Sequence, residues 1–421
     1  MSSESQRARP LVLVLGGGFA GVGAARKLKD AAVDVVLVDA HDYHTFQPLL
    51  YQVATALLEQ SAVGHPLRDL FHEHPNVRVH LDEVTGIDLD TRTVTFAEIA
   101  PITYDYLVLA LGAEVNFFGT AGTPDHAFPM YTLADAIRLR KHLLGKWEDA
   151  DKNAALVEDG ALNVVVVGGG PTGVESAGAL AELYNTNFSD DYPNIRRERA
   201  TITLVEASPH LFGMFKEKLR EYTKGALEER GVTVLLGELV ESVEPTRVKL
   251  KSGTVLDAHT LVWGAGLSAS PLAKSLGLEL ERGGRVTVEP DLSIAGHPEA
   301  FAVGDIAWIT DTKHDEVLPQ LGSVALQAGA HAGETIVRSL KGKDREPFRY
   351  HDKGTMATIG RGAAVVQLPR GRTLKGEVAW LAWGSVHLAL LSTGEDRAKA
   401  VVEWTWAGFT HERAARISVE A

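Results

Sequence analysis

Two short glycine-rich segments have the residue types and spacing that can hold the phosphates of a dinucleotide. Residues 16–21 read GGGFAG and residues 168–173 read GGGPTG, so both fit the pattern G-x-G-x-x-G. In such a loop the first glycine permits a tight turn, the second lets the backbone approach a pyrophosphate, and the third lets a helix pack closely on a strand. The pattern alone is weak, because flexible glycine turns are common. Its meaning therefore depends on the elements around it.

An acidic residue follows each loop where a ribose is expected. Asp39 stands 23 residues after Gly16, and Glu206 stands 38 residues after Gly168. A carboxylate there can accept hydrogen bonds from ribose hydroxyls, and the usual spacing is about 20 residues. We attribute the longer second spacing to a polar insertion at 185–200. Glu206 favours NADH over NADPH, because a carboxylate repels the extra phosphate and no arginine follows it directly.

The segments around both loops are typical of βαβ units. Each loop follows an apolar run and precedes a helical pattern, and a second apolar run then ends in the acid. These segments are 11–15, 19–29 and 33–39 for the first loop, and 163–167, 171–184 and 201–206 for the second. We therefore predict an α/β protein with two Rossmann-type dinucleotide-binding domains, the second inserted in the first. The predicted boundaries are 1–117 with 285–370 for the first domain, 160–280 for the second, and 371–421 for a C-terminal helical segment.

Two further carboxylates, outside the glycine loops and their acids, could contact a cofactor. Asp305 ends the strand-like run 301–305, where it could bind the ribityl hydroxyls of a flavin with the N-terminus of a following helix aimed at the cofactor. Taken alone it could instead cap a helix, but beside two dinucleotide loops we favour the flavin. Glu175 lies in the first turns of the second predicted helix. It is either a carboxylate favoured by the helix dipole or a group at the nicotinamide face that orients the carboxamide or handles a proton.

Composition excludes several classes of function. The sequence has no cysteine, so disulfides, thiolate metal sites and Cys-x-x-Cys redox chemistry are excluded and electrons must travel on a bound cofactor. The formal net charge of -13 argues against a nucleic-acid partner. The polar first ten residues show no signal peptide, and no apolar stretch reaches the length of about 18 residues that a membrane-spanning helix needs.

The order of these motifs is similar to that of flavoproteins with two dinucleotide-binding domains. Within them, the sequence resembles the type II NADH dehydrogenases, the single-subunit NADH:quinone oxidoreductases. The matching segments are HTFQPLLYQVA at 44–54, YDYLVLALG at 104–112, GGGPTGVE at 168–175, KGTMATIGR at 353–361, AWLAW at 379–383 and VHL at 386–388. The resemblance extends from about residue 10 to residue 417.

This resemblance implies non-covalently bound FAD in the first domain and NADH in the second. It also implies reduction of a quinone (menaquinone or ubiquinone) at the membrane surface, without proton pumping. Glu175 then matches the family's functional glutamate near the nicotinamide and the quinone. The lack of cysteine fits, because relatives similar to lipoamide dehydrogenase, thioredoxin reductase or sulfide:quinone reductase need a redox cysteine pair.

The chain departs from the family pattern at two places. The family usually carries Ala-Gln-x-Ala-x-Gln beside the flavin, whereas residues 322–327 read GSVALQ, so that Gln327 is kept and Ser323 replaces the first glutamine. After Leu391 a basic and aromatic turn is usual, whereas residues 392–397 read STGEDR. These departures leave two alternatives open. One is a soluble NADH-dependent reductase of a small redox protein such as ferredoxin, and the other is a slow-turnover, flavin-bound NADH sensor or interaction protein.

The C-terminal segment contains two short apolar runs with tryptophans, at 378–391 and 400–409. Neither is long enough to span a bilayer, and both suit a position at the membrane surface. The alternative is that they pack as a C-terminal core or as the contact of a homodimer. We expect a protein peripheral on the cytoplasmic face of the cell membrane, or a cytoplasmic one if the tail is not an anchor. His387, alone on an apolar face, is interpreted as a structural hydrogen-bonding group.

The predicted site residues follow from these motifs and from the resemblance. For FAD they are Gly16, Gly18, Phe19, Ala20, Gly21, Asp39, Ala40, Gln47, Pro48, Val84, Ala110, Gly112, Gly304, Asp305, Gly322 and Ser323. For NADH they are Gly168, Gly170, Pro171, Thr172, Gly173, Glu206 and Gly266. The quinone residues are Ser323 and Gln327, and the catalytic residue is Glu175. No metal site is predicted.

Overall fold

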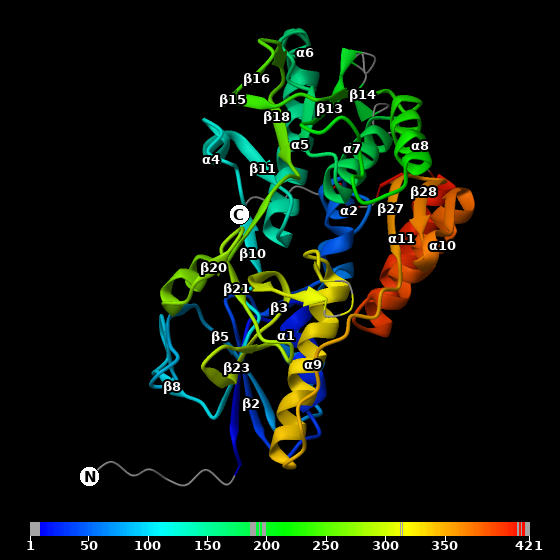
Figure 1. Cartoon of the computed structure of the whole chain (residues 1–421). Helices are drawn as coiled ribbons and strands as arrows, with labels where there is room; N and C mark the ends of the chain where they lie inside the picture. Colours follow the sequence, from blue (N-terminus) through cyan, green and yellow to red (C-terminus); the bar gives the residue numbers. More distant parts are fainter. Residues whose placement is uncertain are drawn as a thin grey trace. The chain divides into compact units, whose positions relative to one another are not determined.

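The chain forms two compact units, each assembled from three separate segments (Figure 1). The computed structural model describes residues 9–185, 191–192, 194–195, 199–311, 313, 315–410, 412–413 and 415–416. The first unit contains Met1–His44, His65–Glu114 and Leu267–His351, and the second contains Thr45–Gly64, Val115–Gly266 and Asp352–Ala421. The polar insertion expected at 185–200 lies partly outside the described residues.

The first unit is built on a six-stranded sheet in the order β22-β23-β9-β1-β2-β5. These strands are β1 (Leu11–Leu15), β2 (Asp34–Asp39), β5 (Val77–Leu81), β9 (Tyr106–Leu109), β22 (Ser293–Ile294) and β23 (His297–Ala302). Neighbouring strands are parallel except β22 and β23, which are antiparallel. Every residue of β1 is buried, as is typical of an inner strand in a parallel sheet.

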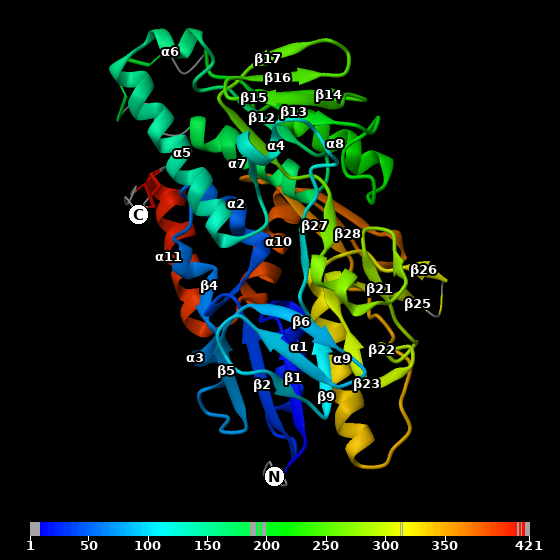
Figure 2. The same ribbon diagram turned by 90° about the vertical axis from the view of Figure 1, so that its left-hand side faces the viewer.

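Helices α1 (Phe19–Leu28) and α9 (Gly322–Leu340) lie side by side in the first unit (Figures 1 and 2). Glycines make this close approach possible. A Cβ atom built on Gly329 would lie 1.8 Å from the carbonyl oxygen of Ala20, and one on Gly23 would lie 2.6 Å from that of Leu326. The two helices therefore pack backbone against backbone, which fixes the start of α9 relative to the first glycine loop.

Short elements complete the first unit. They are α3 (Leu67–Phe71), the antiparallel strands β6 (Val84–Asp88), β7 (Thr93–Phe96) and β8 (Ile102–Thr103), the strands β20 (Leu280–Glu281), β21 (Arg285–Thr287) and β24 (Ala307–Trp308), the 3-10 turns η5 (Pro271–Leu276) and η6 (Gly304–Ile306), and the pair β25 (Thr310–Asp311) and β26 (Glu316–Val317). Strands β3 (Tyr43–Thr45), β4 (Gly64–Pro66), β10 (Ala113–Val115) and β19 (Leu267–Ala269) lie where the chain passes from one unit to the other.

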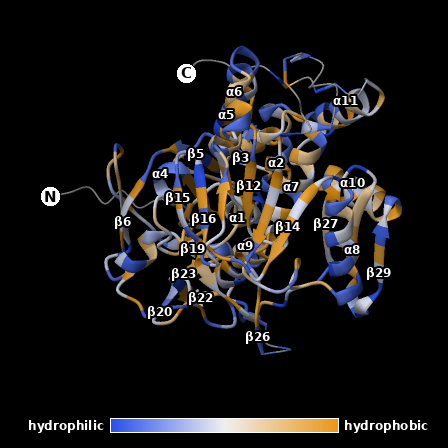
Figure 3. Cartoon of the chain, turned by 90° about the horizontal axis from the view of Figure 1, so that it is seen from above, coloured by the Kyte–Doolittle hydropathy of each residue, from blue (hydrophilic) through white to orange (hydrophobic). Residues whose placement is uncertain are grey.

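The second unit repeats the architecture with a five-stranded parallel sheet in the order β11-β18-β12-β13-β14. These strands are β11 (Ala127–Pro129), β12 (Val164–Val167), β13 (Ile202–Glu206), β14 (Val232–Leu236) and β18 (Thr260–Trp263). Strand β12 consists of four buried valines and is among the most hydrophobic segments in Figure 3. The helices of this part are α4 (Thr123–His126), α5 (Leu133–Lys152), α6 (Ala155–Glu158), α7 (Pro171–Tyr184) and α8 (Glu217–Glu228), beside the antiparallel strands β15 (Val240–Glu244), β16 (Arg247–Leu250) and β17 (Val255–Asp257).

Two distant segments join the second unit. One holds the turns η1 (Gln47–Leu49) and η2 (Gln60–Ala62) with α2 (Leu50–Ala54), and α2 packs on α5 and α7. The other forms an antiparallel sheet of β27 (Thr355–Gly360), β28 (Ala363–Gln367) and β29 (Thr373–Gly376), the turn η7 (Pro369–Gly371), and helices α10 (Glu377–Leu390) and α11 (Gly394–Thr410). Among the described residues, no helix combines the length and apolar character needed to cross a membrane.

The α/β fold with two Rossmann-type units is confirmed, and two local expectations differ from the structure. The predicted boundaries placed 45–64 and 352–370 in the first domain, whereas both group with the second unit because α2 and β27 pack on α7. They also placed 267–280 in the second domain, whereas this segment groups with the first unit. The prediction of a helix directly after Asp305 is wrong. A single 3-10 turn and strand β24 follow instead, and α9 begins only at Gly322.

Candidate functional site

The first glycine loop has the shape that its sequence predicts. Gly16 has φ +103°, and a Cβ atom there would lie 2.3 Å from the carbonyl oxygen of Ala110. A Cβ atom on Gly21 would lie 1.7 Å from the carbonyl oxygen of Gly16. By contrast, a Cβ atom on Gly18 would meet nothing within 4 Å, so the backbone at the start of α1 faces open space. This arrangement suits a pyrophosphate held at a helix N-terminus.

The carboxylate of Asp39 is fixed against this loop. It accepts hydrogen bonds from the backbone N–H of Gly17 at 2.5 Å and of His41 at 2.7 Å. The hydrogen bond to Asp39 also raises the pKa of His41. Because one carboxylate oxygen binds the middle glycine of the loop, loop and acid form one structural element at the end of β2.

A buried histidine beside the first loop, His44, was not among the predicted cofactor residues. Nδ1 of the buried His44 lies 2.9 Å from the carbonyl oxygen of Gly17, and burial lowers the pKa of His44. The neutral ring therefore donates a hydrogen bond to the loop. The ring of Phe19 meets His44 edge-on, with 5.3 Å between centroids. The motif at 44–54 was the available signal, because it begins with this histidine.

The structure also gathers predicted flavin residues from later in the chain around the same loop. Gly304, with φ +73°, leaves only 3.0 Å between a built Cβ atom and the Cβ of Ala20. A Cβ atom on Gly322 would lie 3.1 Å from the ring of Phe19. Helix α9 begins at Gly322 without a capping side chain, so its first N–H groups can bind a partly negative group. Ala110 and Gly112 follow β9, and Val84 lies in the buried core opposite Phe96.

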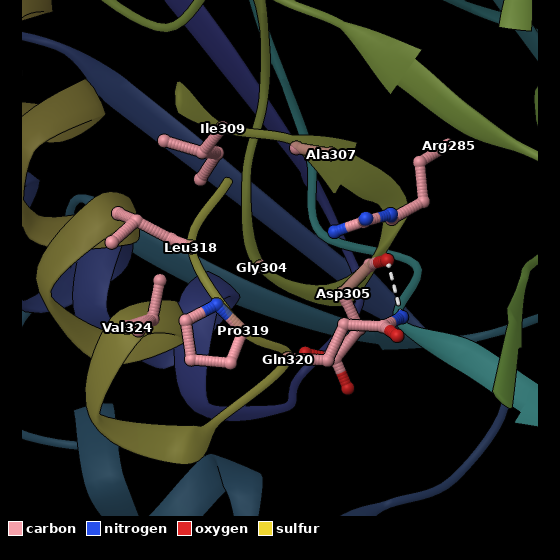
Figure 4. Close-up of a pocket in the computed structure, with 9 residues that line it drawn as sticks. All are labelled: Arg285, Gly304, Asp305, Ala307, Ile309, Leu318, Pro319, Gln320 and Val324. Atoms are coloured by element: carbon pink, nitrogen blue, oxygen red, sulfur yellow. Dashed lines mark hydrogen bonds between the residues drawn. The ribbon is translucent and has the colours of Figure 1, made fainter. Parts of the chain in front are cut away.

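A small pocket lies beside Asp305 in the first unit (Figure 4). Gln320 closes one side by donating from Nε2 to the backbone carbonyl of Asp305 at 3.0 Å. The guanidinium of Arg285 lies over the ring of Trp308, 4.1 Å from its centroid, and the charge of Asp305 acts on it. Sequence reasoning missed Arg285, because nothing in the local pattern marks a single arginine in a short strand.

The second glycine loop repeats the geometry of the first. Gly168 has φ +115°, a Cβ atom on Gly173 would lie 1.9 Å from the carbonyl oxygen of Gly168, and one on Gly170 would meet nothing within 4 Å. Glu206 accepts from the backbone N–H of Gly169 at 2.5 Å and of Ser208 at 2.6 Å. The two units therefore hold an acid against a middle glycine in the same way.

The remaining predicted NADH residues lie at the same end of the second sheet. Pro171 begins helix α7 at a position where its missing N–H costs no hydrogen bond, and Thr172 follows it. Gly266 has φ +72°, and a Cβ atom there would lie 2.4 Å from the ring of Phe118. The exposed ring of Phe118 was not foreseen in the sequence.

Glu175 points away from solvent, with 9% of its surface exposed. Its carboxyl group accepts the backbone N–H of Thr358 at 3.2 Å. Burial raises the pKa of Glu175 to about 8, against the smaller opposing effect of that hydrogen bond. The carboxyl group is therefore mainly protonated at neutral pH, and it can give or take a proton near that pH.

One face of α7 holds β27 against this glutamate. Gly178 lies one turn after Glu175. A Cβ atom built on it would lie 2.0 Å from the carbonyl oxygen of Ile359, so only a residue without a side chain allows this close contact. One turn further, Glu182 accepts the backbone N–H of Arg361 and faces the buried guanidinium of Arg413 at 3.7 Å. The contact that buries Glu175 thus depends on three positions of one helix face.

The predicted quinone residues are engaged with one short segment of the first unit. The hydroxyl groups of Ser323 and Tyr350 lie 2.9 Å apart. Gln327 donates to the carbonyl of His351 at 3.2 Å and accepts its N–H at 3.0 Å. Gln327 therefore anchors this segment through both ends of its amide, and its assignment to a quinone stays a prediction.

Comparison with known proteins identifies the family. Residues 10–329 match the family model of the pyridine nucleotide-disulphide oxidoreductases. Two Mycobacterium tuberculosis proteins named type II NADH:quinone oxidoreductase are each 37% identical over 413 residues, covering 94% of this chain and 86% or 88% of their own length. A Staphylococcus haemolyticus protein of the same name is 30% identical and covers 88% of this chain.

The chain belongs to the type II NADH:quinone oxidoreductase family.

Solved structures agree with the fold. A Plasmodium falciparum protein described as NDH2 in complex with NADH superimposes with a TM-score of 0.89 at 20% identity, covering 98% of this chain and all of that one. The sulfide:quinone oxidoreductase of Aquifex aeolicus gives a TM-score of 0.72 at 20% identity. Despite the name of the wider family, this chain has no cysteine for disulphide chemistry.

The C-terminal helices expose apolar side chains from the two short apolar runs noted in the sequence. On α10, Val378 is 64% exposed and Leu381 is 61% exposed, and on α11 Trp406 and Phe409 are exposed as well. His387 behaves as the structural group that its position predicted. Its Nδ1 lies 2.8 Å from the carbonyl of Trp383, and burial lowers its pKa to about 4.

Proposed function

We propose that this chain oxidises NADH and passes the electrons to a quinone through non-covalently bound FAD. The likeness over nearly the whole chain to proteins named type II NADH:quinone oxidoreductase carries this conclusion. It does not favour the alternatives of a ferredoxin reductase or a slow NADH sensor. The two glycine loops support this proposal. The backbone is open at Gly18 in the first loop and at Gly170 in the second, and each loop binds the acid at the end of the following strand.

The residues of the first unit fit a flavin dinucleotide. The loop of Gly16 and Gly18 would hold the pyrophosphate, Asp39 the adenosine ribose and Asp305 the ribityl chain, with the N-terminus of α9 facing the ring system. When bound, the flavin supplies the redox chemistry by accepting a hydride and giving up two electrons. The assignment to FAD rests on the ribose-binding acid, which a mononucleotide flavin does not need.

The second unit would select and orient the nicotinamide coenzyme. Both carboxylate oxygens of Glu206 already accept backbone N–H groups, so the charge cannot turn away from a 2′-phosphate. Ribose hydroxyls, in contrast, can donate to it. This arrangement favours NADH over NADPH by electrostatic repulsion.

Glu175 would handle a proton during reduction of the quinone. Reduction to a quinol consumes two electrons and two protons, and a buried carboxylic acid near its pKa at neutral pH is suited to deliver one of them. The single N–H donated by Thr358 fixes the carboxyl group, while burial excludes competing solvent.

The exposed apolar residues of α10 and α11 would bind a membrane surface, where quinones dissolve. Two short helices with tryptophans suit the interfacial region of a bilayer. We place the protein peripherally on the cytoplasmic face of the cell membrane. A homodimer joined through part of the same apolar surface is the competing arrangement, and sedimentation of the purified protein with and without detergent separates the two.

Turnover with different electron acceptors tests the proposed function. Purified protein with NADH should reduce a short-chain ubiquinone or menaquinone in many turnovers and should reduce ferredoxin only slowly. Comparison of the two quinones identifies the better substrate. Fast reduction of ferredoxin with none of quinone would support the reductase alternative instead, and slow turnover with every acceptor would support the sensor.

A further inference from the structure

A chain of hydrogen bonds connects the C-terminal helix α11 to a buried tyrosine on α2. Nε1 of Trp404 donates to Oε1 of Gln52 at 2.7 Å. Nε2 of Gln52 in turn donates to the hydroxyl of Tyr51 at 2.9 Å. All three residues belong to the second unit.

The direction of this chain is fixed by chemistry. The orientation of a glutamine amide is often ambiguous, but an indole N–H can only donate, so the oxygen of Gln52 must face Trp404. The amide nitrogen then faces Tyr51, whose hydroxyl must accept. As a consequence, the hydroxyl hydrogen of Tyr51 is not used by Gln52 and remains available for donation in another direction.

Helix α11 is held in register by contacts of the residues that precede Trp404. The carboxylate of Glu403 accepts the backbone N–H of Glu59 at 2.9 Å, and Nζ of Lys399 lies 3.4 Å from the carbonyl oxygen of Ser61. The ring of Trp383 lies 6.0 Å from that of Trp404. Trp404 is therefore a fixed donor rather than a mobile surface side chain.

Tyr51 shares its buried surroundings with Glu175. Helix α2 packs on α7, and Tyr51 and Glu175 are both buried. The charge of Glu175 contributes to raising the pKa of Tyr51, after burial as the main cause. Within the described part of the chain, the Tyr51 hydroxyl accepts from Gln52 and donates no hydrogen bond to another protein group.

We propose that Trp404 and Gln52 are positioning residues, which hold the Tyr51 hydroxyl as a hydrogen-bond donor toward the buried surroundings of Glu175. The C-terminal helix thereby controls the electrostatic environment of the proton-handling carboxyl group. This inference rests on the proposed function only for the role of Glu175 in proton delivery to the quinone, since the hydrogen bonds themselves involve no substrate.

The groups that act on Glu175 in the described part of the chain come from two elements. Thr358 of β27 donates its backbone N–H to the carboxyl group, and Tyr51 of α2 lies close enough for the charge of Glu175 to act on it. On its own helix, Glu182 lies two turns away, with Arg413 from the C-terminal tail facing it. A change confined to Trp404 leaves all of these charges in place, so an altered titration of Glu175 in that variant reports the hydroxyl dipole.

The test is an infrared pH titration of the Glu175 carboxyl band, assigned by its loss in Glu175→Gln, on the purified flavin-loaded protein. Trp404→Phe keeps an aromatic side chain and removes the indole N–H, so the amide of Gln52 can turn and accept from Tyr51. The midpoint should then rise by about half a pH unit, because the carboxylate loses a favourable dipole. Trp406→Phe on the exposed side of α11 is the matched control and should leave the midpoint unchanged.

A second background makes the test specific. In Tyr51→Phe, which has no hydroxyl, adding Trp404→Phe should cause no further shift. Gln52→Met removes the amide that directs the hydroxyl hydrogen of Tyr51, so the hydroxyl is no longer held in one orientation. The midpoint should then rise in the same direction by a smaller amount, and this variant serves if Trp404→Phe folds poorly. An unchanged midpoint in folded Trp404→Phe, or the same shift in the Tyr51→Phe background, overturns the inference. The titration uses no quinone, so it can fail independently of the proposed function. An unchanged midpoint in an enzyme that reduces quinone refutes only this inference. The predicted shift in a protein that does not reduce quinone refutes only the proposed function.

Discussion

Glu175 is a buried carboxyl group whose pKa is set mainly by its burial. Burial raises this pKa to about 8, against a smaller opposing effect of the hydrogen bond from the N–H of Thr358. As a proton donor it must be protonated, so quinone reduction in the parent enzyme should slow as the pH rises through about 8. Glu175→Gln should lower the rate at pH 7 and abolish this decline, measured as kcat with saturating quinone between pH 6 and 9.

The stability of the same variant provides a control that needs no substrate. The pKa of Glu175 is higher in the folded than in the unfolded chain, so its stabilising contribution is full below the unfolded pKa and is lost as the pH rises through the folded one. The parent should therefore lose stability relative to Glu175→Gln between about pH 5 and pH 8. Parallel stability curves for the two proteins would contradict the assigned pKa.

Glu206 is a second residue whose hydrogen bonds predict the result of substitution. Both of its carboxylate oxygens accept backbone N–H groups, and the amide nitrogen of glutamine cannot. Glu206→Gln should raise KM for NADH roughly tenfold and narrow the preference over NADPH. Asp39→Asn is the matched change in the first loop, and it should reduce flavin retention instead. A Glu206→Gln enzyme with the parent's KM values for both coenzymes would refute this role.

At the scale of elements, the face of α7 that meets β27 depends on one glycine. A Cβ atom on Gly178 would lie 2.0 Å from the carbonyl oxygen of Ile359, so Gly178→Ala must push β27 away from Glu175. We expect a loss of ~1–3 kcal/mol in the free energy of unfolding, measured by chemical denaturation. Gly145→Ala in α5 is the control, because a Cβ atom there meets nothing within 4 Å. It should stabilise by roughly 0.5–1 kcal/mol, and equal effects of the two changes would contradict the packing argument.

The same elements show what the sequence could predict. The helix at 171–184 was predicted with its observed bounds, because a proline opens it and an apolar strand and glycine loop precede it. Both acids were found because each ends the predicted strand that follows its glycine loop, although the spacing to Glu206 is longer than usual. The docking of β27 and α2 on α7 was not found, because such contacts join segments far apart in the chain and leave no local periodicity. Arg285 was missed for the same reason, because the ring of Trp308 under its guanidinium lies in another strand.

At the scale of the whole molecule, the exposed apolar residues of the C-terminal helices predict attachment to membranes. Val378 and Leu381 are both more than 60% exposed, so replacing them by aspartate should leave the fold intact. The double variant should lose most of its cosedimentation with lipid vesicles while keeping its turnover with a water-soluble quinone. Val255→Asp, on the exposed strand β17, is the matched control. Unchanged cosedimentation of the double variant would instead favour an apolar contact between two copies.

The central claim is that one chain holds both a flavin and NADH so that electrons pass between them. An anaerobic absorbance spectrum of the purified protein, followed by stepwise addition of NADH, tests it most directly. We predict a flavin spectrum with about one FAD per chain that one equivalent of NADH bleaches and NADPH bleaches far more slowly. A protein that remains colourless after reconstitution with FAD, or a bound flavin that NADH fails to reduce, would contradict the account.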